Sequence, residues 1–392
     1  MATAFANLSW GVVAALWMAA AHPVVAAPGR VPPDRQQYAG AEACVRCHPR
    51  HARHFASTAH ALTSSWPTAG TIKAPATRGA NVVRLAADRV EVTLDADGYF
   101  QTATPVSPGR QPRRERIDLV TGSGRHGQSF IWRRGDELFQ LPLSYWTEAA
   151  RWAPSPGFTG ADARFDRAIT PLCLDCHATY VASTSRADRF DLSTALLGVT
   201  CEKCHGPGAA HVAARSSRPA ARLAIDADVV NPATLSREQR VDLCAYCHGG
   251  TPLTGPFTFR AGDPVGPSRQ ASQATAAGTP PGNASVVALD SHGQQAPALQ
   301  MSRCYQASTM TCETCHDVHE TQRDLAAMSK KCQACHAPQA CGLYATRSRT
   351  IATQCVDCHM PVQASSGIST GSDTSRVQPR IRSHVIRVYG RP

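Results

Sequence analysis

The sequence predicts a mainly α-helical fold with many loops and one small antiparallel β insertion. Three observations predict it. The chain of 392 residues contains seven copies of the pattern Cys-x-x-Cys-His, each of which we expect on or beside a short helix. It has 28 glycines and 28 prolines but only 6% aromatic residues, which favours loops over long regular elements. Residues 81–150 alternate between apolar and polar side chains, which is typical of half-buried strands.

The seven patterns indicate covalent attachment of seven haem c groups, and we number them motif 1 to motif 7 in chain order. In such a motif two thiols bond the porphyrin vinyl groups and the histidine binds the iron. The attaching cysteines are Cys44, Cys47, Cys173, Cys176, Cys201, Cys204, Cys244, Cys247, Cys312, Cys315, Cys332, Cys335, Cys355 and Cys358. The proximal iron ligands are His48, His177, His205, His248, His316, His336 and His359. Structural zinc knuckles are the alternative, but they need no histidine after every cysteine pair.

A chain with so few aromatic residues has little from which to build a large side-chain core. Porphyrins offer flat apolar faces that short helices and loops can cover. We therefore expect a fold built around packed haems in the region that carries most of the motifs.

The first 27 residues predict a signal peptide. Residues 8–21 are almost wholly apolar, and Val25-Ala26-Ala27 offers a cleavage site after Ala27, although no Lys or Arg precedes the apolar stretch. An uncleaved N-terminal membrane anchor is the alternative, but the stretch is short for a membrane span. Export to the periplasm is therefore expected, in an oxidising compartment where spare cysteines can pair.

The mature chain divides into three parts. Residues 28–80 form a first haem segment, 81–150 the β insertion, and 151–392 a haem-rich helical region with the other six motifs. Strands are expected at Asn81-Val-Val-Arg-Leu and Arg89-Val-Glu-Val-Thr-Leu, with a turn at Asp95-Ala-Asp-Gly. Short helices are expected from residue 169 onward, with surface loops at 258–283 and 362–378.

The net charge of +11 first suggests a nucleic-acid partner. Only four of the cations are lysines, however, and arginine can fork onto haem propionates. Seven ferric haems with ionised propionates would lower the charge to about +4. No nucleic-acid partner is therefore predicted.

A second axial ligand, where an iron has one, would come from outside the motifs. His319 follows His316 by three residues on the same side of a helix, so it can reach a neighbouring iron rather than its own. His211 follows motif 3 closely, and His51 competes with His54 for one position. The candidate distal ligands are His51, His60, His126, His211, His292, His319 and His384. Methionine is the other common axial ligand, but Met301, Met310, Met328 and Met360 are interpreted as packing residues.

Several short stretches within residues 120–362 carry a family resemblance. They are Thr121-Gly-Ser-Gly-Arg-His-Gly-Gln-Ser-Phe, Cys201-Glu-Lys-Cys-His-Gly-Pro-Gly-Ala-Ala-His, Met310-Thr-Cys-Glu-Thr-Cys-His-Asp-Val-His and Cys355-Val-Asp-Cys-His-Met-Pro. With them the chain resembles the multihaem c-type cytochrome superfamily, which includes the nitrifier tetrahaem cytochrome, pentahaem nitrite reductase, octahaem hydroxylamine oxidoreductase and octahaem tetrathionate reductase. The resemblance implies a helix-dominated multihaem cytochrome c fold, closely packed haems, and trailing histidines that serve as distal ligands.

The sequence departs from the catalytic members in one respect. The nitrite and tetrathionate reductases mark their catalytic haem with a lysine in place of the motif histidine, and no motif here ends in lysine. The leading hypothesis is therefore a periplasmic heptahaem electron-transfer cytochrome with bis-histidine haems. Its expected partners are periplasmic or membrane redox proteins, and further copies of the chain in an oligomer are the other partner considered. The alternatives are an oxidoreductase for a small nitrogen or sulfur compound at one five-coordinate haem, and a cytochrome subunit whose sheet docks a partner.

Two cysteines, Cys304 and Cys341, lie outside the motifs. A leftover pair in an exported protein suggests a disulfide. A thiolate bound to iron and two free buried thiols are the other interpretations.

The haem count gives the first testable prediction. Mass spectrometry of the mature protein should show a chain that starts at or near Pro28 and carries the added mass of seven haems. A fully matured protein with six or fewer would mean that one motif attaches nothing.

Overall fold

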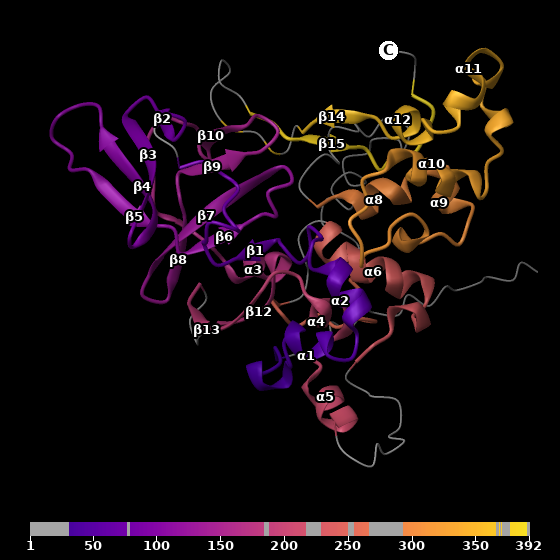
Figure 1. Ribbon diagram of the computed structural model, residues 1–392, viewed down its shortest axis with the longest axis horizontal. Coiled ribbons are helices and arrows are strands. Elements are labelled where there is room, and N and C mark those ends of the chain that lie inside the picture. Colours follow the sequence, from indigo (N-terminus) through magenta and orange to yellow (C-terminus); the bar gives the residue numbers. More distant parts are fainter. Residues whose placement is uncertain are drawn as a thin grey trace, which may run out of the picture. The chain divides into compact units, whose positions relative to one another are not determined.

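The computed structural model describes residues 31–76, 79–183, 188–216, 229–249, 255–265, 293–365, 368, 370 and 377–389, which all belong to one compact unit, Val31–Pro392 (Figure 1). The predicted signal peptide and His292 lie outside the described residues. About 29% of the described residues are helical and 24% are in strands. The expectation of a mainly α-helical fold is therefore wrong.

A four-stranded antiparallel sheet forms where alternation predicts strands. Its order is β2 (Val82–Arg84), β3 (Asp88–Asp95), β4 (Gly98–Pro105) and β5 (Arg113–Arg116). The β3–β4 turn pairs Asp95 with Gly98, and Gly98 has a positive φ of 121°, a conformation that favours glycine. Val90 and Val92, on the inward face of β3, are fully buried.

A seven-stranded antiparallel sheet continues the chain. Strands β1 (Ser64–Ser65), β6 (Leu119–Thr121), β7 (Gly127–Arg134), β8 (Glu137–Gln140) and β11 (Arg167–Ala168) follow one another in space, while β9 (Leu143–Trp146) pairs with β7 and with β10 (Arg151–Pro154). Its aromatic side chains pack together: Phe130 lies 5.1 Å from Trp152, and Trp132 lies 5.0 Å from Phe139, between ring centroids. The sheets thus have a side-chain core of their own.

The helices are short. They are η1 (Arg35–Gln37), α1 (Ala41–Val45), α2 (Pro49–Phe55), α3 (Pro171–His177), α4 (Cys201–His205), α5 (Ala209–Ser216), η2 (Pro232–Thr234), α6 (Arg237–His248), α8 (Gln295–Gln300), α9 (Arg303–Gln306), η4 (Cys312–Thr314), α10 (Leu325–Gln333), η5 (Pro338–Ala340), α11 (Tyr344–Ile351) and α12 (Cys355–His359). The α6 helix, with 12 residues, starts at a capping box formed by Ser236 and Gln239.

Strands also form where short helices were predicted, and at the start of the predicted surface loop at 362–378. The β12 (Ala178–Ser183) and β13 (Phe190–Leu197) strands make a hairpin directly after α3, and β14 (Val362–Ala364) pairs with β15 (Arg380–Arg382). The reason is local: α3 ends at the motif histidine, and Ala178 is already extended, with φ −136° and ψ 157°. The β-branched Thr179 and Val181 then favour the strand.

The predicted surface loop at 258–283 also needs a correction at its start. Thr258 is 8% exposed, and the preceding Phe257 is 5% exposed with its ring 5.7 Å from that of Tyr180. Residues 266–283 lie outside the described part of the chain. In the parts that the structure describes, no helix is both long and apolar enough to cross a membrane.

A buried side chain on β4 links its sheet to β9 of the other sheet. Gln101 on β4 is fully buried, and its amide accepts from the Leu143 backbone N–H (2.9 Å) and donates to the Leu143 carbonyl (2.8 Å) on β9.

Replacement of this glutamine should weaken the β region. We expect Gln101→Leu to lower the free energy of unfolding by about 2–4 kcal/mol, because it leaves buried backbone groups without these partners. Denaturant titration followed by circular dichroism measures the loss. Gln300→Leu, at an exposed position on α8, is the control and should change little. Equal stability of both variants would contradict this account.

Candidate haem-binding site

All seven motifs form a helical turn. Motifs 2, 3, 4 and 7 lie in α3, α4, α6 and α12, and in the others the histidine N–H donates to the carbonyl of the first cysteine, at 2.8 Å for His48 and 3.0 Å for both His316 and His336. Residues four apart share one face of a helix, so the first thiol and the imidazole lie on the same side. Each motif can therefore offer its thiols and its histidine to one porphyrin.

Apolar side chains beside the motifs are exposed to an unusual degree. Val45 inside motif 1 is 45% exposed, Leu172 just before motif 2 is 37% exposed, and Leu62 is 40% exposed. The α1, α2 and α5 helices bury no residue at all. Uncovered aliphatic surface next to paired thiols fits a flat apolar group such as haem c.

Thiols of different motifs lie against one another. In three such pairs a side-chain interaction with the partner thiol raises the pKa of the first cysteine: Cys44 with Cys201, Cys176 with Cys247, and Cys244 with Cys312. With the thiols free, the interaction with Cys201, followed by burial, raises the pKa of Cys44. Burial raises the pKa of Cys332 to about 11, with further contributions from Cys355 and Cys315. Motif 1 thus adjoins motif 3, motif 4 adjoins motifs 2 and 5, and motif 6 adjoins motifs 5 and 7.

Three motif histidines face one of the predicted distal candidates. The ring centroids are 6.0 Å apart for His60 and His248, 6.2 Å for His205 and His319, and 6.3 Å for His316 and His384. Two imidazoles that bind one metal ion from opposite sides, each at about 2 Å, have centroids about 6.3 Å apart. The spacing in all three pairs therefore suits a metal ion between the rings.

Hydrogen bonds on Nδ1 orient several of these rings. Nδ1 lies 2.8 Å from the Val230 carbonyl in His205, 3.0 Å from Gln295 Oε1 in His248, and 3.1 Å from the Arg382 carbonyl in His384. His177 and His359 have similar bonds, to Thr63 Oγ1 (3.0 Å) and the Arg387 carbonyl (2.9 Å). A proton held on Nδ1 by a carbonyl leaves Nε2 free to bind a metal.

Burial keeps two of the candidate distal imidazoles, those of His60 and His384, neutral. It lowers the pKa of His60 to about 4, helped by the neighbouring His248 and His316, and it also lowers the pKa of His384 to about 4. Only the neutral ring has a lone pair for a metal ion. Both side chains are therefore in the ligand form near neutral pH.

The other candidates are not paired in this way. His51 lies 5.2 Å from His319 at a 58° tilt, so it stands beside that pair. His126 is half exposed, with Nδ1 2.6 Å from Glu148 Oε1. His211 lies on α5, and His54 is exposed on α2. Their roles, like that of His292, stay predictions.

The two cysteines outside the motifs are half-buried and are not bonded to each other in the structure. Burial raises the pKa of Cys315, and Cys304 adds to the effect, so Cys304 lies near motif 5. The disulfide between Cys304 and Cys341 stays a prediction.

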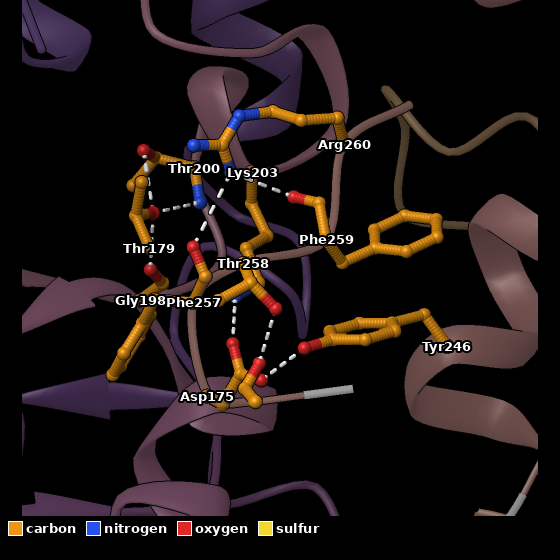
Figure 2. A network of polar contacts seen from close by, with 11 residues as sticks. Asp175, Thr179, Gly198, Thr200, Lys203, Tyr246, Phe257, Thr258, Phe259 and Arg260 are labelled. Carbon is orange, nitrogen blue, oxygen red and sulfur yellow. Dashed lines mark hydrogen bonds and ion pairs between the residues drawn. The ribbon is translucent and has the colours of Figure 1, made fainter. Parts of the chain in front are cut away.

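Sequence reasoning missed the residues between the motif cysteines. Asp175, Lys203 and Tyr246, from motifs 2, 3 and 4, meet in a polar network (Figure 2). Glu202, beside Lys203, is 4% exposed and accepts hydrogen bonds from the backbone N–H of Ala39 (2.8 Å), Gly40 (2.8 Å) and Gly208 (2.7 Å). The sequence did contain a signal for this network, because charged residues stand between the two attaching cysteines of motifs 2 and 3.

Residues 157–206, which contain motifs 2 and 3, match the family model of cytochrome c554 and c-prime. Among solved structures, the chain is similar to the outer cell wall cytochrome OcwA, with 15% identity, coverage of 90% of this chain and 80% of that chain, and a TM-score of 0.49. No curated protein matches. The family match and the motifs together indicate covalently bound haem c.

One glycine allows the close approach that positions His60. Gly198 has a φ of +73°, and a Cβ there would lie 2.2 Å from the carbonyl oxygen of Ala61. We expect Gly198→Ala to push the segment of His60 away from His248, so that one iron becomes high-spin in electron paramagnetic resonance. Gly135→Ala is the control, because Gly135 also has a positive φ (+63°) but nothing within 4 Å. An unchanged Gly198→Ala spectrum would contradict this role.

Proposed function

We propose that the chain is a multihaem c-type cytochrome that transfers electrons along a row of seven covalently attached haems with paired histidine ligands, as the seven motifs and the family match at residues 157–206 support. The observation that carries the proposal is the set of three imidazole pairs at 6.0, 6.2 and 6.3 Å. Haem c supplies an iron that gains or loses one electron, at a potential set by its axial ligands and surroundings.

The histidines of the chain determine whether each iron is open. His60, His319 and His384 stand opposite motif histidines, from segments far away in the sequence. Two nitrogen ligands fill both axial positions, which favours electron transfer over substrate binding. We assign the distal positions of the remaining irons to His51, His126, His211 and His292.

The thiol contacts support a continuous route. The thiol pairs Cys44–Cys201 and Cys244–Cys312, together with the influence of Cys204 on the Cys244 pKa, connect motifs 1, 3, 4 and 5. The neighbours of Cys332 extend the row to motifs 6 and 7, and Cys176–Cys247 adds motif 2. Attachment points in contact favour short distances between porphyrin edges, which is what hopping requires.

Exposed attachment points suggest where electrons enter and leave. Among the motif thiols, Cys47, Cys173, Cys335 and Cys358 are exposed, and they belong to motifs 1, 2, 6 and 7. Motifs 3, 4 and 5 have only half-buried thiols. The proposed partners are periplasmic or membrane redox proteins that dock at the exposed motifs, and the proposed location is the periplasm.

Carbon monoxide distinguishes this carrier from an enzyme. The reduced holoprotein should show no rapid stoichiometric change of its Soret band on addition of the gas, and no steady turnover of nitrite or hydroxylamine, because its irons lack an open position. Rapid binding at one haem together with steady turnover would support the oxidoreductase instead.

Ligand variants test the pairs one at a time. We expect His60→Ala, His319→Ala and His384→Ala each to convert one low-spin iron to high-spin and to create one site for carbon monoxide, with all haems still attached. Phe55→Leu is the control: its ring lies 6.3 Å from that of His319 but offers no nitrogen. Low-spin spectra in all three alanine variants would remove the paired-ligand assignment.

A further inference from the structure

The residues enclosed by the cysteines of three motifs meet in one buried network. Lys203 Nζ lies 2.6 Å from Asp175 Oδ1, and the Tyr246 hydroxyl donates to Asp175 Oδ2 (Figure 2). Asp175 belongs to motif 2, Lys203 to motif 3 and Tyr246 to motif 4. A single ion pair with one phenol therefore links three attachment sites.

Burial makes these charges strong. The side chain of Asp175 is 0% exposed and that of Lys203 is 12% exposed. The ammonium also lies 4.8 Å from the Phe257 ring centroid, and the Tyr246 ring stacks at 4.2 Å on that of Phe259. With little water to screen them, such charges act over longer distances than surface charges do.

Their place in the chain brings these groups close to the porphyrins. Each lies between the two cysteines of a motif that matches covalent haem attachment. We propose that Asp175, Lys203 and Tyr246 together set the reduction potentials of the haems at motifs 2, 3 and 4. The proposal rests on haem occupancy of those motifs, as proposed above.

The sign of each contribution follows from charge. Reduction removes one positive charge from an iron porphyrin. The Asp175 carboxylate favours the oxidised state and lowers the potential, while the Lys203 ammonium favours the reduced state and raises it. The Tyr246 hydroxyl spreads the carboxylate charge through its hydrogen bond, so it also raises the potential. All three are positioning residues that act through their field and take no part in ligation.

Potentiometric titration of the holoprotein, followed by its visible spectrum, tests these signs. We expect part of the titration curve to move to higher potential in Asp175→Asn and to lower potential in Lys203→Met and Tyr246→Phe. The double variant Asp175→Asn with Lys203→Met should return toward the wild-type curve. If these residues only packed against their neighbours, the single variants would not shift the potential in opposite directions, and the double variant would not return toward the wild-type curve.

Matched controls come from the same residue types elsewhere. Asp357 holds the same place in motif 7 as Asp175 in motif 2, but it is 50% exposed and pairs with Arg382 at 2.9 Å. Asp357→Asn should therefore shift the curve much less. Lys73, exposed and outside the motifs, supplies the control Lys73→Met, which should leave the curve unchanged.

Mass spectrometry of every variant separates this inference from the proposed function. Fewer than seven haems in the wild-type protein would count against the proposed function. Wild-type haem content with superimposable curves in all four network variants would overturn the inference alone. If Asp175→Asn loses haem, Tyr246→Phe decides, since it keeps both charges: a curve at lower potential supports the inference, and an unchanged curve overturns it.

Discussion

A haem attached to a single helical turn would receive two thiols and one imidazole from that turn, so the second imidazole of the proposed ligation would come from elsewhere in the chain. This constraint would account for the long-range histidine contacts in the structure. His60 follows motif 1 and faces the histidine of motif 4, while His384 near the C-terminus faces that of motif 5. Helices as short as these bury little surface of their own, so the proposed irons and porphyrins would supply much of the cohesion of this region.

The antiparallel sheets act as a frame for these long-range pairings. Ser64 on β1 donates to the His177 carbonyl (2.6 Å) and accepts from the Gly198 N–H (2.8 Å). One strand therefore contacts both motif 2 and the segment that directly precedes motif 3. The Val199 N–H donates to the His60 carbonyl at 2.9 Å, which holds the backbone of His60 against the same segment before motif 3. The sheets have an aromatic core of their own, which supports this geometry.

The Asp175–Lys203–Tyr246 network adds electrostatics to this frame. A buried ion pair is costly to form, and its loss on one side leaves an uncompensated charge. Here the charges lie between attaching cysteines, where a field acts directly on the proposed electron carriers. The same contacts that hold three motifs together can therefore also adjust how readily each haem accepts an electron.

The sequence by itself determined the attachment chemistry, because a covalent motif is local: seven Cys-x-x-Cys-His patterns need no knowledge of the fold. Alternation likewise predicted β2 and β3, since a half-buried strand shows its period in its own residues. It did not predict the β12–β13 hairpin, because short strands beside a motif have weak patterns and depend on partners distant in the chain. Only the tertiary structure decided which histidines face each other and which motif residues contact the buried Asp175 carboxylate. Both depend on contacts between segments that lie far apart in the sequence.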